Sequence, residues 1–241
     1  IELMEGVEDI PGAVLREGVR WEWETFPDYL DALDRMPRAL DIGTQIPHAA
    51  VRVFVMGERG LKRERATPED LASMGRIVRE AIEAGALGFS SSRAIVHKSS
   101  KGESIPSLDA AAEELAAIAR AVGATGRGVL QLISDFTDLD REFGLILEML
   151  RVSGRPLSYT LLQNDFMVGR WRELLARTHA ARAEGLALRA QVGCRPIGLL
   201  LGLQGSMNPF IGRRAYQAIA DLPFAERLAR MRTPEVRRAI L

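Results

Sequence analysis

Polar side chains follow several apolar runs of this 241-residue chain, and two of them have the chemistry of catalytic groups. The imidazole of His48 and the carboxylate of Asp135 can transfer protons or hold a cation. Four further side chains can hydrogen-bond a polar substrate, and the guanidinium among them can also clamp a carboxylate through two hydrogen bonds. These candidate substrate-binding residues are Ser91, Gln163, Gln191 and Arg195.

Both catalytic candidates also have a purely structural interpretation. His48 lies in the segment TQIPHAA, where backbone carbonyls can hold a loop histidine, and Asp135 can cap a helix expected to begin near Asp138. The other two histidines are expected outside any site, His97 in an exposed loop and His179 on the solvated face of a helix. The sequence therefore leaves both roles of His48 and Asp135 open.

Five segments have the apolar spacing and the end signals of amphipathic helices. The clearest is 67–85, in which Thr67 is the N-cap, Pro68 suits the first turn, Asp70 completes a capping box and Gly85 ends the helix. The other four are 27–36, 107–123 with Ser107 as its cap, 138–154 and 168–185.

Five apolar runs of strand length alternate with these helices in a βα rhythm. The runs are mostly continuous, which is typical of parallel strands covered on at least one face. The segment VRVFVMG (51–57) fits either a strand or a short helix. The expected strands are 39–46, 86–92, 128–134, 156–163 and 186–193.

This order predicts a parallel α/β fold, with both a (β/α)₈ barrel and a doubly wound sheet still open. No glycine-rich nucleotide-binding motif follows a strand, which weakens the doubly wound alternative. Five or six strands are too few to close an eight-stranded barrel, so a barrel here would be partial. From about residue 197 the chain changes to a loop-like segment followed by short helices.

The charge balance, the length of the apolar runs and the cysteine content indicate which binding partners and which cellular compartment to expect. The 32 basic side chains balance 32 acidic ones, which gives no electrostatic case for binding nucleic acid or an anionic membrane. The longest apolar run, 197–203, is too short to span a bilayer, and no signal peptide is recognisable. The single cysteine, Cys194, is expected to pack rather than to act as a nucleophile, and it excludes an intrachain disulfide. We expect a reducing, cytoplasmic compartment.

Four segments resemble the N-acyl-D-amino-acid deacylase branch of the amidohydrolase superfamily. They are WEWETFPDYLDAL (21–33), QIPHAAVRVFVMGERG (45–60), EAGALGFSSSR (83–93) and ARAEGLALRAQV (181–192), in the order in which the family has them. The resemblance implies a TIM-like barrel that hydrolyses an amide with a metal ion, usually zinc. We therefore predict that 1–196 is the central part of such a barrel within a longer protein, and that 197–241 begins an inserted cap segment.

The chain departs from the pattern that the resemblance implies. The family's histidine ligands on the fifth and sixth barrel strands correspond to Ile133 and Leu161, and its lysine in the sixth strand corresponds to Gln163. Ile95 stands near a family tyrosine, and Gln191 replaces an acid in the seventh strand. Aliphatic side chains have no lone pair for zinc, so we assign no metal ligand to this chain. The remaining family ligands are expected outside these residues.

Two functions follow as expectations from the resemblance, and a stand-alone doubly wound domain that binds a small ligand is a third alternative. The chain is part of a metal-dependent hydrolase of a small-molecule amide such as an N-acyl-D-amino acid, or it is a divergent relative that binds a ligand without metal chemistry. Under either hypothesis residues 1–241 alone should bind no stoichiometric zinc and should lack deacylase activity. Unpaired strand edges should also favour self-association.

Overall fold

The sheet of this protein is wholly parallel in the computed structural model, which describes residues 1–8, 10–163, 167–194, 201–205 and 208–241. Its order in space, β1-β2-β3-β4-β5, is also its order in the sequence. Each βα unit therefore advances one step in the same direction, as in a (β/α) barrel and unlike a doubly wound sheet. The strands are β1 (Ile46–Pro47), β2 (Gly88–Arg93), β3 (Val129–Ser134), β4 (Leu157–Thr160) and β5 (Leu188–Gln191).

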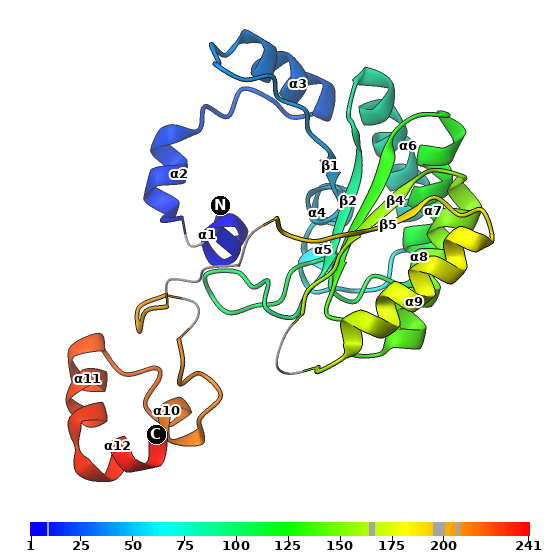
Figure 1. Ribbon diagram of the computed structural model, residues 1–241. Coiled ribbons are helices and arrows are strands. Elements are labelled where there is room, and N and C mark those ends of the chain that lie inside the picture. Colours follow the sequence, from blue (N-terminus) through cyan, green and yellow to red (C-terminus); the bar gives the residue numbers. More distant parts are fainter. Residues whose placement is uncertain (9, 164–166, 195–200, 206–207) are drawn as a thin grey trace.

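Four amphipathic helices cover one face of this sheet, as Figure 1 shows. Each follows a strand of the sheet, α7 packs between α6 and α8, and the Arg177–Asp140 ion pair joins α9 to α8, which is the arrangement of a barrel wall. They are α6 (Pro68–Ala84), α7 (Ala112–Ala124), α8 (Leu139–Ser153) and α9 (Arg170–Ala183). The expected α/β class and partial barrel are confirmed, because the sheet ends at β1 and β5 without closing.

The end signals read from the sequence explain where these helices start and stop. Thr67 Oγ1 accepts the Asp70 N–H and the Asp70 carboxylate accepts the Thr67 N–H, which completes the expected capping box of α6. Asp138 caps α8 by a single bond, in which its carboxylate accepts the Arg141 N–H. Gly154 ends α8 at a φ of 61°, a conformation that glycine adopts without strain.

Two expectations about local structure were wrong, and one segment that the sequence left open between strand and helix is helical. Residues 39–45 are not a strand, because only Ile46 and Pro47 pair with β2, and Leu40 in this segment is largely exposed. The segment 51–57 follows the helical alternative, because residues 51–56 belong to α4 (His48–Met56), which buries Val51 and Met56, and Gly57 is its C-cap. Ser107 does not cap α7, which begins five residues later; its hydroxyl donates to the Ser92 carbonyl and ties the preceding loop to β2.

The main core lies between the sheet and its helices. One set of alternating strand residues is almost fully buried there, and apolar residues of α6 to α9 pack on the same cluster. This burial fixes which strand residues face the helices and which face the other way. The core residues supplied by strands include Phe89, Leu130, Leu132, Leu157, Tyr159 and Leu188.

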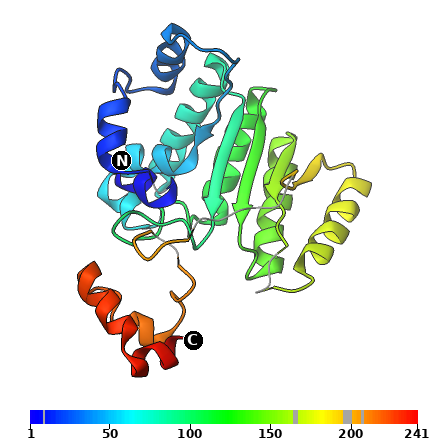
Figure 2. The same cartoon turned by 60° about the vertical axis from the view of Figure 1, so that its left-hand side comes forward.

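The remaining helices are short and lie outside this layer. They are α1 (Glu2–Glu8), α2 (Gly12–Gly18), α3 (Phe26–Arg35), α5 (Glu58–Leu61), α10 (Arg214–Gln217), α11 (Phe224–Arg232) and α12 (Pro234–Ile240). The last three pack on a small apolar cluster of their own around Tyr216, Ile219 and Ile240, apart from the sheet in Figures 1 and 2. Among the described residues, none of the helices has the length and apolar character of a membrane span.

Candidate functional site

The sheet has a covered face, which packs on α6 to α9, and an open face on its opposite side. Along β2, β3, β4 and β5 the residues alternate between the two faces, as the burial pattern of each strand shows. In a closed barrel the face opposite the helices is the interior, and active sites lie at the carboxyl ends of the strands. The open face is therefore where a ligand would bind.

A row of polar side chains crosses the open face. The strand register places Ser90 beside Gln131, Gln131 beside Ser158, and Ser158 beside Arg189. Barrel interiors are usually filled by branched apolar residues at this level. A continuous polar row instead offers hydrogen-bonding groups and one positive charge.

A second row lies one step nearer the carboxyl ends of the strands. Ser92 pairs with Ile133, and Thr160 pairs with Gln191. Because Leu132 pairs with Tyr159, the next residues of these two strands, Ile133 and Thr160, are also neighbours. Ile133 is thus an aliphatic position in an otherwise polar row.

Two loop contacts form the mouth of this face at the end of β2. Ser92 Oγ lies 2.7 Å from His97 Nδ1, which holds the loop after β2 against the strand end. The Ile95 N–H donates to Asp135 Oδ2 at 2.6 Å, which joins the same loop to the end of β3. His97 is therefore a half-buried member of this mouth rather than the freely exposed residue that we expected.

The covered face holds a buried polar network around Glu114 of α7. His48 lies between two partners, with Nδ1 2.8 Å from Ser91 Oγ and Nε2 2.8 Å from Glu114 Oε1. Arg52 Nε donates to the same Glu114 oxygen at 2.9 Å, and its other nitrogens donate to the backbone carbonyls of Gly60, Pro106 and Glu64. Glu114 Oε2 is buried and has no hydrogen-bond partner among the described residues.

The network lowers the pKa of the Glu114 carboxyl group, which favours its ionised form. Burial acts to raise the pKa of its carboxyl group, but the hydrogen bonds from His48 and Arg52 and the electrostatic attraction to both side chains outweigh burial and lower that pKa. His48 Nε2 and Arg52 Nε can then both donate to one negatively charged oxygen. The arrangement fixes α4 and α7 against β2 and leaves neither ring nitrogen of His48 free.

A second buried ion pair anchors the carboxyl end of β2 to α8. Arg93 donates to both oxygens of Glu142, at 2.6 Å from Nε and 3.0 Å from Nη2, and the Ser134 hydroxyl donates to Glu142 as well. Arg93 Nη1 donates to the Ala110 carbonyl, which also fixes the loop before α7. These bonds set the position of the strand ends that border the open face.

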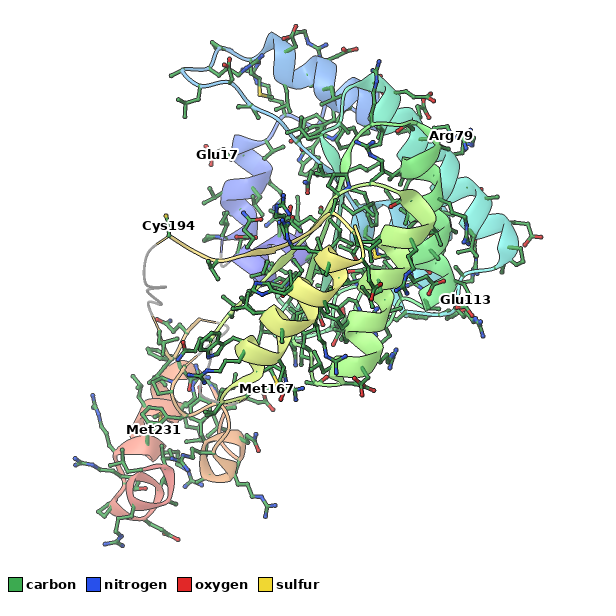
Figure 3. All side chains as sticks on the ribbon, turned by 45° about the vertical axis from the view of Figure 1, so that its right-hand side comes forward. Glu17, Arg79, Glu113, Met167, Cys194 and Met231 are labelled. Atoms are coloured by element: carbon green, nitrogen blue, oxygen red, sulfur yellow. The ribbon has the colours of Figure 1, made fainter. Side chains whose placement is uncertain are left out.

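The structure separates the candidates identified from the sequence. His48 and Ser91 lie together on the covered face, whereas Gln191 lies on the open face and Asp135 at its mouth. Gln163 is exposed beyond the end of β4, and Arg195 lies outside the described residues. The expectation that Cys194 packs was wrong, because it is exposed where the chain leaves β5; Figure 3 shows it far from the outer helical layer that carries Arg79 and Glu113. His179 is exposed, as expected.

Several residues of both faces were missed, and a signal for each was present. Gln131, Ser158 and Arg189 alternate with apolar residues along their strands, so strand parity alone places them on one face. Glu114 lies four residues before Ile118 and Glu142 four before Ile146, on the apolar stripe of each helix. A carboxylate on such a stripe requires a buried partner.

Comparison with known proteins identifies the family. The model of the amidohydrolase family matches residues 1–241. The chain belongs to this family. It is 39% identical over 80 residues to a D-aminoacylase of Alcaligenes xylosoxydans xylosoxydans, which is 33% of the chain and 16% of that relative. An uncharacterized protein of Mycobacterium tuberculosis is 31% identical over 101 residues, 40% of the chain and 16% of the relative.

Solved structures of amidohydrolases support the fold. A D-aminoacylase structure described for its binuclear metal centre superposes with a TM-score of 0.58 and 23% identity, over 70% of this chain and 33% of that one. A D-aminoacylase mutant in complex with copper chloride gives the same values. The chain thus spans about a sixth of the curated relatives that it matches and a third of these solved chains.

The described part of this amidohydrolase does not fit a metal ion by itself. It contains no group of three His, Cys, Asp or Glu side chains placed to hold one. Ile133 on the open face has no donor atom, and Leu161 is buried in the core cluster, not on the open face. Any metal bound at the open face of the complete barrel would therefore need ligands from residues outside those described here.

Proposed function

We propose that this chain is the central part of a metal-dependent amidohydrolase that hydrolyses the amide bond of a small molecule, with N-acyl-D-amino acids as the substrate class. The observation that carries the proposal is the polar open face on a sequentially wound parallel sheet, in a family that includes D-aminoacylase. Hydroxyl and amide side chains suit the recognition of an uncharged amide. Zinc is the metal that the family resemblance implies.

The chain's own residues would bind and position the substrate. Gln191 and Thr160 can hydrogen-bond the amide from the open face, and Asp135 at the mouth is the candidate for a proton-transfer role. His48 and Ser91 would act as positioning residues, because their network holds β2 from the covered side. Gln163 and Arg195 remain candidate contacts at the carboxyl edge of the sheet.

We also propose a division of the chain at residue 196. Residues 1–196 would contribute the barrel, and 197–241 would begin an inserted cap, which is supported by the separate apolar cluster of α10 to α12. A cytoplasmic location is supported by the single cysteine alone. Self-association of the isolated chain would arise from the unpaired edges of β1 and β5.

The test of the function is hydrolysis by the complete purified protein. N-acetyl-D-amino acids, their L enantiomers and an unrelated amide would be compared by release of the free amine, with and without prior treatment by a chelator. We expect turnover of the acylated amino acids that chelation removes and added zinc restores. Absence of turnover for every N-acyl amino acid would refute the proposal. Residues 1–241 alone are expected to be inactive, because an unclosed barrel lacks the remaining strands.

A divergent, non-catalytic relative is the second candidate. It is favoured by the aliphatic Ile133 in the polar row and by the missing metal-ligand group among the described residues. In that case the complete protein should bind N-acyl amino acids without turning them over. It should also contain no stoichiometric metal.

A further inference from the structure

We propose that Arg189 binds the carboxylate of the substrate, so that the ligand of the open face is an acyl amino acid with a free acid group. The inference rests on the proposed function and deepens it by naming the residue that would recognise the acid group of the substrate. Arg189 was not among the candidates identified from the sequence. Arg189 is the second residue of β5, and its side chain lies on the open face.

The strand register fixes this placement. Leu188 and Ala190 alternate with Arg189, and Leu188 belongs to the core between sheet and helices, so Arg189 faces away from α9. Its neighbour in the row is Ser158 of β4, followed by Gln131 of β3. The neighbours of the Arg189 side chain in this row are therefore neutral polar side chains.

Charge gives the class of ligand. The residues in the two rows of the open face are serine, glutamine, threonine and isoleucine apart from Arg189, so none of them supplies a counter-charge. Within the described parts of the chain, Arg189 forms no ion pair, and its Nη1 donates a long hydrogen bond of 3.4 Å to the Leu188 carbonyl. A guanidinium has a planar fork of donors that matches a carboxylate.

The spacing between strands indicates where the amide and the acyl chain of such a ligand would lie. In an N-acyl amino acid the amide carbon lies three bonds from the carboxylate carbon, about 3.5 Å away by standard bond lengths. Adjacent strands are roughly 4.8 Å apart. With the carboxylate at Arg189, the amide would lie over β4, near Ser158 and Thr160, and the acyl chain would extend toward Ile133 of β3.

This placement of the ligand explains why an aliphatic side chain, Ile133, lies in an otherwise polar row. An aliphatic side chain next to the acyl group favours an apolar acyl chain through burial of surface from water. Within the two rows, the positive charge of Arg189 and the aliphatic side chain of Ile133 lie on strands separated by β4. They match the two ends of one ligand.

The experiment measures binding rather than turnover, so that it is independent of the metal. The complete protein would be titrated by calorimetry with an N-acyl amino acid and with the matching carboxamide, which lacks the negative charge. We expect the wild-type protein to bind the acid more tightly, and Arg189→Gln to weaken binding of the acid by about tenfold or more, as loss of a charge-assisted pair should. Binding of the carboxamide should be unchanged in Arg189→Gln.

Two further variants separate charge from folding. Arg189→Lys keeps the charge without the fork and should lose only part of the affinity. Arg79→Gln removes an exposed arginine from the outer face of α6 and should match wild type within about twofold, since exposed side chains away from a site contribute little. Figure 3 shows Arg79 on that outer layer.

Equal affinity of the wild type for acid and carboxamide, no effect of Arg189→Gln, or no binding of either ligand would each overturn the inference. Binding that depends on Arg189 in a protein without turnover would leave the inference standing and refute only the proposed catalysis. Turnover of acid and carboxamide at equal rates would support the proposed catalysis and refute the role of Arg189.

Discussion

Arg93 and Glu142 form a two-pronged ion pair that joins the carboxyl end of β2 to α8, with both side chains nearly excluded from solvent. The pair lies on the covered side of the sheet, next to the strand ends that border the open face. Its partners on the backbone and on Ser134 satisfy further polar atoms of the network. Geometry of this quality is required before a buried ion pair offsets the loss of hydration of its charges.

Removing one partner of this pair should strongly destabilise the protein. Arg93→Met leaves the buried Glu142 carboxylate with only the exposed Arg141, 4.0 Å away, as a positive partner, and we expect a loss of about 3 kcal/mol in the free energy of unfolding. The measurement is urea denaturation followed by circular dichroism. As a matched control, Arg151→Ala breaks the exposed pair with Glu184 and should cost less than about 1 kcal/mol. Similar losses for both variants would contradict the structural role given to Arg93.

Stability should decline in acid because of Glu114. Its pKa in the folded protein is below the ordinary value of 4.5, so between the two values the unfolded chain binds a proton that the folded protein does not. The stabilisation is fully present above about pH 4.5 and is lost as the pH falls through the folded-state pKa. Urea unfolding between pH 3 and pH 7 should show this decline.

The variant Glu114→Gln tests that assignment. It cannot ionise, so its stability should be lower at pH 7 and should change less between pH 7 and pH 3 than that of wild type. Glu113→Gln, at the exposed neighbouring position on the same helix, should keep the wild-type pH dependence. An unchanged pH dependence in Glu114→Gln would show that another group is responsible.

The capping box of α6 gives a smaller, local effect. Thr67→Ala removes the acceptor of the Asp70 N–H, and loss of such a cap typically costs about 1 kcal/mol. Arg59 also donates to both Asp70 oxygens, which keeps that carboxylate in place in the variant. Thermal unfolding should show a modest drop in midpoint. Thr137→Ala, at an exposed loop position, should lie within about 0.5 kcal/mol of wild type.

Much of the covered layer could be predicted from the sequence, because its signals are local. In α6 the cap, the proline and the final glycine lie at the two ends of the helix or directly beside them in the sequence, and periodicity identifies the buried stripe. The segment 51–57 was ambiguous since a short apolar run has too few residues to establish a period of 3.6. Its helical state depends on Val51 and Met56 packing against the rest of the core.

The site could be predicted less well, because its geometry depends on register. The run SSSR at 90–93 contains three serines whose faces cannot be assigned until Phe89 is known to be buried. Ser91 then turns toward His48, while Ser92 turns toward the open face. Likewise, the pairing of His48 with Glu114 joins residues that are 66 positions apart, for which no local pattern exists.

Metal binding provides the test of the open face as a site. Residues 1–241 of the wild type should hold no stoichiometric zinc, because the described residues lack a suitable ligand group. The double variant Ile133→His with Thr160→His places two imidazoles on neighbouring strands of the same face, about 5 Å apart, and should gain zinc binding. The measurement is competition with a chromophoric chelator.

The control for this double variant places the second histidine at position 161 instead of position 160. Ile133→His with Leu161→His should not gain the site, because Leu161 is 5% exposed within the core cluster, not on the open face with Ile133. It should instead lose stability, since a buried imidazole without a partner is costly. Equal zinc affinity in the two double variants would contradict the register of β3 and β4. Stoichiometric zinc in the wild-type chain would show that its own residues already form a metal site.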